Sequence, residues 1–262
     1  MKLNLLSEMQ KVKGIELYKH QLYVVEGLLK SESDTIHTVL AKRQIGKSVL
    51  LEQILLYYAF NKKGSTSICL SPTNAQNRKI FSEMNDSILK FCPNLVKKSN
   101  ISTQEIEFTN GSKILFKSAA QKDSLRGYTV SGVLCMDECA FISDDIFYMC
   151  LPFTNVHKSP IVLVSTPKFK MGFFYDCFVK GQGNVSGYKS YDLGEFDTSE
   201  LLSPSKLEIY RKQLPKLQFQ CEYLGEFIDS DSMVFSGFKD CLIKESFEPR
   251  NVYVAIDWAN GS

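Results

Sequence analysis

Short apolar and β-branched runs, separated by segments of helical character, constrain the fold of this 262-residue chain more than any other feature. The runs cover residues 35–41, 66–70, 132–136 and 161–165. Helices are expected over residues 17–30, 49–60 and 75–91. The last two apolar runs are uninterrupted, as expected of central parallel strands covered on both faces. Alternating strands and helices predict an α/β fold with a doubly wound, mainly parallel sheet.

Turn and cap signals organise the rest of the chain. Residues 105–109 and 112–117 flank Asn110-Gly111, the strongest short hairpin signal. Ser203-Pro204 places a capping residue and a first-turn proline at the start of a helix, and Pro215 separates it from a second helix. Strands are also expected at residues 188–192 and 253–257. We therefore expect a core over residues 1–190, a small helical lid or linker over 191–250, and the beginning of another domain over 251–262.

Composition leaves several classes of protein open and excludes others. The chain is 44% hydrophobic, enough for a substantial core, and its net charge of +2 neither demands nor excludes nucleic acid. Its eight cysteines form no Cys-x-x-Cys pair, which predicts free thiols rather than a zinc site. The longest apolar stretch, residues 49–60, is broken by Glu52 and Gln53 and is too short to span a bilayer. We expect a soluble intracellular protein with no signal peptide and no membrane partner.

A phosphate-binding turn is predicted at residues 41–48, Ala-Lys-Arg-Gln-Ile-Gly-Lys-Ser. It sits between a strand and a helix that we expect to be amphipathic, where backbone N–H groups and a helix N-terminus can surround phosphates. Lys47 would reach the β- and γ-phosphates, and the Ser48 hydroxyl would coordinate Mg²⁺. The strict pattern has glycine where this chain has Ala41. The alternative is an exposed turn in which Ser48 caps a helix.

A pair of carboxylates follows the apolar run at residues 132–136. Asp137 would lie at the carboxyl edge of the sheet, beside the phosphate-binding turn, and hold the water shell of Mg²⁺. Glu138 would then orient and polarise the attacking water. The alternative is an ordinary Asp-Glu pair at a strand end. Together, the turn and the pair predict a Mg²⁺-dependent ATPase.

These motifs resemble those of the large terminase subunit of tailed bacteriophages, over about residues 15–262. Arg43 matches an arginine that this family carries near the start of its phosphate-binding turn, and Asp137-Glu-Cys-Ala-Phe-Ile142 resembles its Walker B stretch. Ser165-Thr-Pro167 matches the family's coupling motif, and Gln220-Cys-Glu-Tyr-Leu-Gly-Glu-Phe227 is similar to the segment leading out of its lid.

Three further matches carry more specific roles in the family. Tyr18-Lys-His-Gln21 resembles its adenine-reading motif, in which the amide of Gln21 would donate and accept at the adenine edge. Ser124-Leu-Arg126-Gly127 matches its Leu-Arg-Gly, whose arginine is implicated as a finger acting on a neighbouring subunit. Asp257 matches the first metal-binding carboxylate of its nuclease domain. The alternatives are a helix-surface glutamine and a solvent-facing arginine.

The resemblance implies a P-loop NTPase fold of the additional-strand type and a set of site residues. The nucleotide-binding residues would be Gln21, Lys42, Arg43, Gln44, Ile45, Gly46, Lys47 and Ser48. Catalysis would fall to Glu138, Arg126 and Arg43, coupling to Ser165, Thr166 and Pro167, and Mg²⁺ binding to Ser48 and Asp137. Residues 251–262 would begin a truncated RNase H-like nuclease domain. Asp257 alone cannot assemble a two-metal site, so we expect no nuclease activity from these residues.

The resemblance also implies a motor that hydrolyses ATP to translocate double-stranded DNA into a procapsid. Its partners would be a portal protein, a small terminase subunit and further copies of itself in a ring of five. It would act in the host cytoplasm, transiently on the procapsid. One alternative is a helicase-type nucleic-acid translocase, which needs a second core domain for which the chain has no room. The other is a non-catalytic assembly module ordered by nucleotide, against which Lys47 and Glu138 argue.

Overall fold

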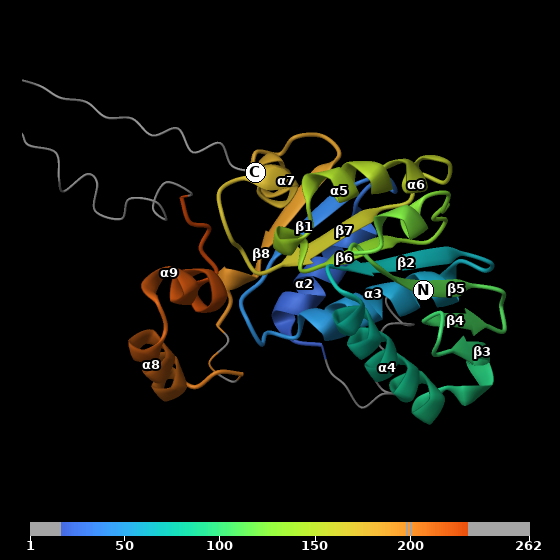
Figure 1. Ribbon diagram of the computed structural model, residues 1–262, viewed down its shortest axis with the longest axis horizontal. Helices are drawn as coiled ribbons and strands as arrows, with labels where there is room; N and C mark the ends of the chain where they lie inside the picture. The colour runs from blue at the N-terminus through green and yellow to red at the C-terminus, as the bar shows by residue number, and fades with distance from the viewer. Residues whose placement is uncertain (1–16, 198, 200, 230–262) are drawn as a thin grey trace, which may run out of the picture. The chain divides into compact units, whose positions relative to one another are not determined.

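One mixed sheet organises the computed structural model, which describes residues 17–197, 199 and 201–229. Eight strands lie in the order β3-β4-β5-β2-β6-β7-β1-β8 (Figure 1). The strands are β1 (Ile36–Leu40), β2 (Thr66–Ser71), β3 (Val96–Asn100), β4 (Glu105–Phe108), β5 (Lys113–Ser118), β6 (Leu134–Asp137), β7 (Ile161–Ser165) and β8 (Tyr188–Asp192). The six strands from β5 to β8 in this order are parallel, and β3 and β4 add an antiparallel edge. The predicted mainly parallel sheet is confirmed.

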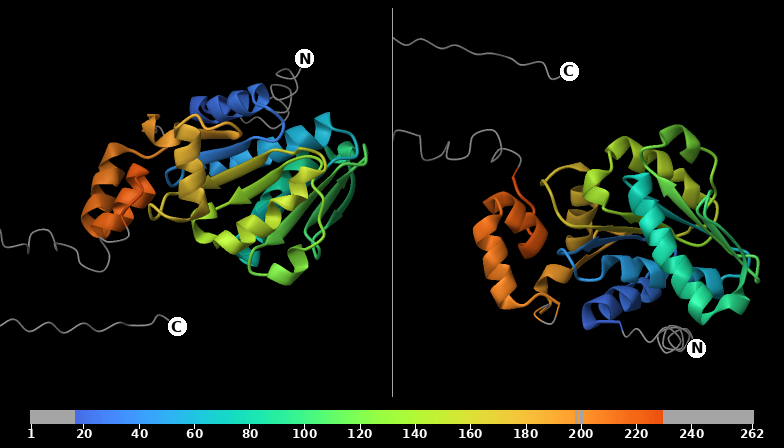
Figure 2. Two further views of the ribbon diagram at one scale, coloured as in Figure 1. Left: turned by 90° about the horizontal axis from the view of Figure 1, so that it is seen from above. Right: turned by 60° about the horizontal axis from the view of Figure 1, so that its bottom comes forward.

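Helices cover both faces of the sheet (Figure 2). One layer holds α2 (Lys19–Lys30), α3 (Lys47–Asn61) and α4 (Asn74–Phe91), and the other holds α5 (Asp144–Cys150), α6 (Pro152–Asn155) and α7 (Gly172–Gln182). Within β6, Cys135 packs with the first layer while Leu134 and Met136 pack with the second. This alternation follows from the strand itself, because successive side chains point to opposite faces. The doubly wound arrangement is therefore confirmed.

Helix α3 differs from its prediction in two ways. It begins at Lys47, two residues earlier than expected, so Lys47 and Ser48 form its first turn. It is also not amphipathic, because nine of its 15 residues are buried, including Glu52 and Gln53. The helix lies against the sheet beside α4, which also packs on the sheet, and most of its side chains are enclosed. The phosphate-binding turn is thus anchored to the most buried helix of this layer.

Strand β7 lies between β1 and β6, and this placement is the additional strand that the resemblance implies. In the register of the sheet, Leu40 pairs with Ser165 and Asp137 pairs with Val164. The three strands are parallel, so their carboxyl ends meet at one edge, where α/β proteins place ligands. The phosphate-binding turn, the coupling motif and the carboxylate pair therefore begin side by side.

The hairpin at Asn110-Gly111 and the helix start at Ser203-Pro204 were predicted correctly. Gly111 has a φ of +84°, and the Asn110 side chain accepts the backbone N–H of Ser112 at 3.0 Å. Helix α8 (Pro204–Gln213) begins at the predicted proline, and Ser203 accepts the N–H of Lys206. Helix α9 (Lys216–Phe219) and the π-helical turn η5 (Gln220–Leu224) follow it. We call residues 204–224 the helical segment; it lies apart from the two helical layers (Figure 1).

The compact part of the structure ends before the C-terminal strand that the sequence predicts. The described residues up to Ile228 cluster as one compact unit. The expected strand at 253–257, and Asp257 with it, lies outside the described residues. Within the described part, no helix is both long enough and apolar enough to cross a bilayer.

Candidate active site

The phosphate-binding turn dispenses with its first glycine because Ala41, directly after β1, is still hydrogen-bonded to β7. Ala41 is fully buried, and its N–H donates to the Ser165 carbonyl of β7 at 3.0 Å. The left-handed conformations fall later, at Gln44 (φ +62°) and Gly46 (φ +82°). A side chain at Gly46 would also collide with Gln21, since its Cβ would lie 2.5 Å from the Gln21 amide nitrogen. Glycine is therefore required at 46 and not at 41.

Two neighbouring side chains of α2 hold the backbone of the turn. The Nε2 atom of His20 lies 2.8 Å from the Ile45 carbonyl oxygen. Gln21 donates to the Gly46 carbonyl at 2.9 Å, and its amide oxygen accepts the Tyr18 N–H at 2.9 Å. Both side chains are buried. The Gln21 amide thus supports the turn, and its expected role at the adenine edge remains a prediction. The structure adds His20, which the sequence did not single out.

Glu138 lies opposite the lysine of the turn. Its Oε1 atom is 3.1 Å from Lys47 Nζ, with 22% of the glutamate side chain and 11% of the lysine side chain exposed. Glu138 follows β6 directly and takes a left-handed backbone conformation, with φ at +49°. Such a conformation is strained for a residue with a side chain and recurs at functional sites. The strained backbone directs the carboxylate back across the sheet edge to Lys47.

The end of β7 contacts the same carboxylate. Ser165 and Thr166 each donate to Glu138 Oε2 at 3.4 Å. The Ser165 hydroxyl also accepts the N–H of Ala140, 3.1 Å away, in the turn η3 (Cys139–Phe141). Motifs that lie 27 and 28 positions apart in the sequence therefore meet at one carboxylate. Pro167 follows them and has no N–H to donate.

Asp137 has the properties of a cation ligand. It is 7% exposed, and its Oδ1 atom has no hydrogen-bond partner. Burial raises the pKa of this carboxyl to about 6; nearby Glu138 adds to the rise and Lys47 opposes it. A buried acceptor of this kind suits a divalent cation, which restores the charge balance.

Ser48 is exposed in the first turn of α3. Among the described residues, no group of three His, Cys, Asp or Glu gathers to hold a metal. Mg²⁺ needs no such group, because it binds through one or two protein oxygens together with substrate phosphates and water. The residues present therefore fit Mg²⁺.

Arg43 contacts the helical segment, and Lys42 runs beside residues on either side of that segment. The Arg43 N–H donates to the Glu222 carbonyl at 2.7 Å, and its guanidinium lies 3.4 Å from the Glu222 carboxylate. The Lys42 side chain runs past Gly194 and Gly225, where an added Cβ would approach it to 3.5 and 3.3 Å. Gln44 is exposed. The first half of the turn thus contacts the helical segment, while its second half faces Glu138.

A cavity of about 230 Å³ opens beside this first half. The turn contributes Lys42, Arg43 and Ile45 to its lining. The other side is mostly aromatic and aliphatic, with Phe196, Leu201, Leu202, Pro204, Leu207 and Tyr223, and it also includes Asp197 and Ser199. An apolar wall faced by cationic groups suits a flat, apolar ligand joined to an anionic group.

Arg126 stands apart from these contacts. It follows the short turn η2 (Lys122–Leu125), precedes Gly127 with its φ of +88°, and is exposed. Within the described residues, its side chain makes neither a hydrogen bond nor an ion pair with the groups around Glu138. The structure therefore brings together Lys47, Glu138, Ser165 and Thr166 and leaves Arg126 outside.

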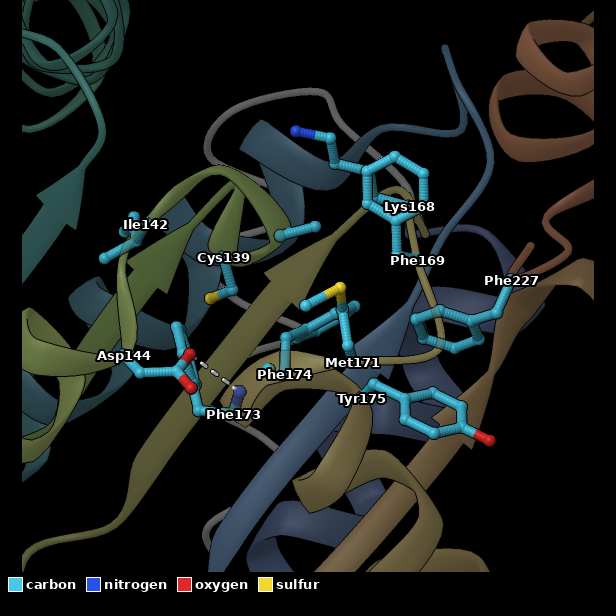
Figure 3. Close-up of a pocket in the computed structure, with 12 residues that line it drawn as sticks. Cys139, Ile142, Asp144, Lys168, Phe169, Met171, Phe173, Phe174, Tyr175 and Phe227 are labelled. Carbon is cyan, nitrogen blue, oxygen red and sulfur yellow. Dashed lines mark hydrogen bonds between the residues drawn. The ribbon is translucent and has the colours of Figure 1, made fainter. Parts of the chain in front are cut away.

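Residues that follow the coupling motif are hydrogen-bonded to residues that follow the helical segment. Phe169 and Ile228 form a parallel β-bridge, in which Ile228 N–H donates to the Lys168 carbonyl and Lys170 N–H donates to the Ile228 carbonyl. Figure 3 shows the ring of Phe227 next to that of Tyr175. The two rings meet edge-on, with centroids 5.0 Å apart. Phe227 also lines a cavity of about 120 Å³ that reaches Cys139, directly after Glu138.

Curated relatives of this chain are large terminase subunits. The subunit of Thermus virus P23-45 is 25% identical over 247 residues, which is 82% of this chain and 50% of the relative. The subunit of Thermus phage G20c is 30% identical over 155 residues, 54% of this chain and 31% of the relative. The chain therefore spans half or less of the length of these relatives.

Solved structures share the fold. The large terminase ATPase domain of Thermus phage P74-26 superposes with a TM-score of 0.71 at 20% identity, over 84% of this chain and 97% of that one. The large terminase of bacteriophage HK97 superposes with a TM-score of 0.70 at 12% identity, over 81% and 51%. A family model described as "Terminase large subunit, T4likevirus-type, N-terminal" matches residues 39–239. Because that match covers most of the sequence, the chain belongs to the terminase large subunit family.

Proposed function

We propose that this chain is the Mg²⁺-dependent ATPase motor domain of a phage large terminase, which hydrolyses ATP to move double-stranded DNA into a procapsid. One observation carries the proposal: Glu138 contacts the lysine of the phosphate-binding turn and the coupling motif at once. A related large terminase from a thermophilic bacteriophage was solved in complex with ADP, which supports nucleotide binding in this fold. The site geometry supports hydrolysis in addition to binding.

Each side chain has a role in this proposal. Lys47 and the N–H groups of the turn hold the β- and γ-phosphates. Glu138 accepts a hydrogen bond from the attacking water and orients it in line with the γ-phosphate. Asp137 and Ser48 would hold Mg²⁺, which neutralises phosphate charge when bound. Because Lys47 contacts Glu138 in the structure, an arriving γ-phosphate competes for the lysine and releases the carboxylate for water.

Coupling to movement runs through the end of β7. Ser165 and Thr166 sense which partner Glu138 has, since both donate to its carboxylate. Pro167 leads from them into the β-bridge with Ile228. A change at Glu138 is thereby passed to the chain that leaves the helical segment. In this scheme residues 1–190 are the ATPase core, 191–250 the lid and linker, and 251–262 the start of the nuclease domain.

The base of the nucleotide lies, in this proposal, in the cavity lined by Ile45 and Phe196. Gln21 supports the turn through its amide, which donates to the Gly46 carbonyl and accepts the Tyr18 N–H. A flat base between aliphatic and aromatic side chains is a common arrangement in nucleotide sites.

Further partners follow from the proposed motor. Copies of the chain would form a ring, taken as five subunits, on a portal protein, with a small terminase subunit helping to engage DNA. Arg126 would act on the ATP of a neighbouring copy, and Arg43 would assist within its own site. The protein would work in the host cytoplasm and transiently on the procapsid. We propose no nuclease activity for residues 1–262, where Asp257 alone matches a nuclease carboxylate.

Phosphate release from MgATP by the purified chain, with and without double-stranded DNA, tests the function. We expect turnover that DNA stimulates and that Glu138→Gln lowers by at least about 100-fold, as loss of a general base does. Glu107→Gln is the matched control, because Glu107 pairs with Lys97 on the β3–β4 hairpin. Equal turnover of wild type and Glu138→Gln would contradict the proposal. ADP binding without any turnover would identify a non-catalytic module.

A further inference from the structure

We propose that His20 is a positioning residue of the phosphate-binding turn, which fixes the Ile45 carbonyl so that the adjoining N–H faces the phosphates. The inference rests on the proposed function. It adds a residue that acts through the backbone of the turn and does not touch the nucleotide.

The argument begins with peptide geometry. The C=O of Ile45 and the N–H of Gly46 belong to one planar trans peptide unit and point in opposite directions. His20 Nε2 lies 2.8 Å from that carbonyl oxygen, and since a carbonyl only accepts, Nε2 donates. Holding the carbonyl against α2 therefore aims the Gly46 N–H away from α2. Gln21 does the same for the next unit, since it binds the Gly46 carbonyl and so directs the Lys47 N–H.

The turn needs this support because its conformation is unfavourable on its own. Gln44 and Gly46, on either side of Ile45, both have positive φ values. A left-handed glutamine costs free energy, which contacts from outside the turn must offset. The hydrogen bond from His20 is buried, with 4% of the side chain exposed, so water does not compete with it.

The histidine ring is itself held in place. It stacks on Tyr18 with centroids 5.5 Å apart and planes within 6°, and it lies 6.1 Å from the ring of Phe196. The donor therefore keeps its direction without depending on the nucleotide. Phe196 also lines the cavity beside the turn, so the His20 ring lies next to a residue of the proposed base site.

Substitutions at His20 separate the donor from the ring. His20→Phe keeps the aromatic packing and removes the donor, whereas His20→Gln places an amide N–H at nearly the reach of Nε2. The control is His37→Phe, because His37 is also buried and hydrogen-bonded, to Tyr191 in β8 at 3.0 Å, outside the turn. The measurements are the Kd for MgADP, by titration calorimetry, and KM and kcat for ATP.

We expect His20→Phe to raise both Kd and KM roughly tenfold, the effect of leaving one buried acceptor unpaired, with kcat within about twofold. Such a pattern marks the loss of binding that is equal in ground and transition states. His20→Gln should restore most of the affinity, and His37→Phe should leave Kd and KM unchanged. If His20→Phe does not fold, His20→Asn replaces it, since its shorter amide does not reach Ile45.

Two results would overturn the inference. One is an unchanged Kd in His20→Phe, or in His20→Asn where that variant stands in. The other is an equal rise of Kd in His37→Phe, which would reduce the effect to general stability. If the wild type itself bound no MgADP, the proposed function would fail first, and that outcome is read from the wild-type titration alone.

Discussion

The ammonium group of Lys47 lies 3.1 Å from a carboxylate oxygen of Glu138, so the cation of the phosphate-binding turn and the proposed base are paired with each other. Neither side chain is fully exposed, so solvent screens the pair only in part. A nucleotide that takes the lysine leaves the glutamate without its counter-charge. Binding of the nucleotide to Lys47 and release of the Glu138 carboxylate for its role as a base are therefore one coupled event.

Lys47→Ala should weaken nucleotide binding and slow turnover together. Lys47 would neutralise phosphate charge in the bound ground state and in the transition state, so its loss affects both Kd and kcat. We expect the Kd for MgATPγS to rise at least about tenfold, the effect of one lost charge-assisted hydrogen bond. Titration calorimetry and phosphate release measure the two effects. Unchanged steady-state hydrolysis by a folded Lys47→Ala protein would refute the site assignment.

Arg126 should act on the ATP of a neighbouring copy. Its exposed position and its separation from the groups around Glu138 place it where another copy can be reached. Arg126→Ala should lower turnover while leaving the Kd for ATPγS nearly intact, because an arginine finger stabilises charge mainly in the transition state. Turnover per subunit should also rise with protein concentration in the wild type and stay flat in the variant.

Mixing two inactive proteins decides between a neighbour and the same subunit. When Arg126→Ala is mixed with Glu138→Gln, some interfaces pair an intact Arg126 with an intact Glu138, and activity should reappear. The control is each variant alone at the same total concentration. If the mixture gives only the sum of its parts while light scattering shows association, the finger does not act between subunits.

Phe227→Ala should disconnect the helical segment from the site. The ring lies 5.0 Å from Tyr175 and 5.5 Å from Phe178, and Ile228 next to it forms the bridge to Phe169. We expect basal phosphate release within about twofold of wild type, since the Phe227 ring packs on Phe174, Tyr175 and Phe178 of α7. Nucleotide-dependent protection of residues 204–224 from limited proteolysis should disappear.

Phe60→Ala is the matched control. Phe60 is a partly buried ring of α3 that packs on Phe108 of β4, on the face of the sheet away from α7. It should lower stability without changing the proteolysis pattern. Retained protection in Phe227→Ala would show that coupling takes another route.

His37 should make the protein less stable in acid. Burial, helped by Lys189, lowers the pKa of this imidazole from 6.5 to about 4. The unfolded chain therefore takes up a proton near pH 6.5 that the folded chain takes up only near pH 4. The contribution of this histidine is fully present above pH 6.5 and is lost as the pH falls towards 4, on the order of 3 kcal/mol in total.

Comparison of His37→Phe with wild type isolates this effect, because other groups titrate alike in both. Urea unfolding at several pH values should show the wild type losing more stability than the variant between pH 6.5 and 4. Parallel curves for the two proteins would show that the pKa of His37 is the same in the folded and the unfolded chain.

Sequence alone identified the strands that carry function because each is an apolar run followed at once by polar residues. Asp137 and Ser165 end β6 and β7 as that pattern predicts. It did not identify α5 and α7. The first has only seven residues and is held mainly by packing of Ile146 and Phe147, and the second begins at Gly172, in a left-handed conformation. Tertiary contacts, rather than local propensity, determine such helices.

The contacts of the site were less accessible from sequence than its members. The sequence identified Lys47 and Glu138 separately. It does not indicate that they form an ion pair, or that Arg43 forms one with Glu222. The role of His20 was hidden for another reason. Its effect passes through a backbone carbonyl, and backbone groups have no letter in a sequence.

The helical segment begins shortly after β8 and is fastened again at Glu222 and Ile228, so it is a closed loop with both ends on the core. The entropy of closing such a loop grows only with the logarithm of its length, and doubling the length costs about 0.6 kcal/mol. Residues inserted beside Pro215, between α8 and α9, would thus be inexpensive to accommodate. A fluorescent reporter can therefore be placed there while the contacts at Glu222 and Ile228 stay where they are.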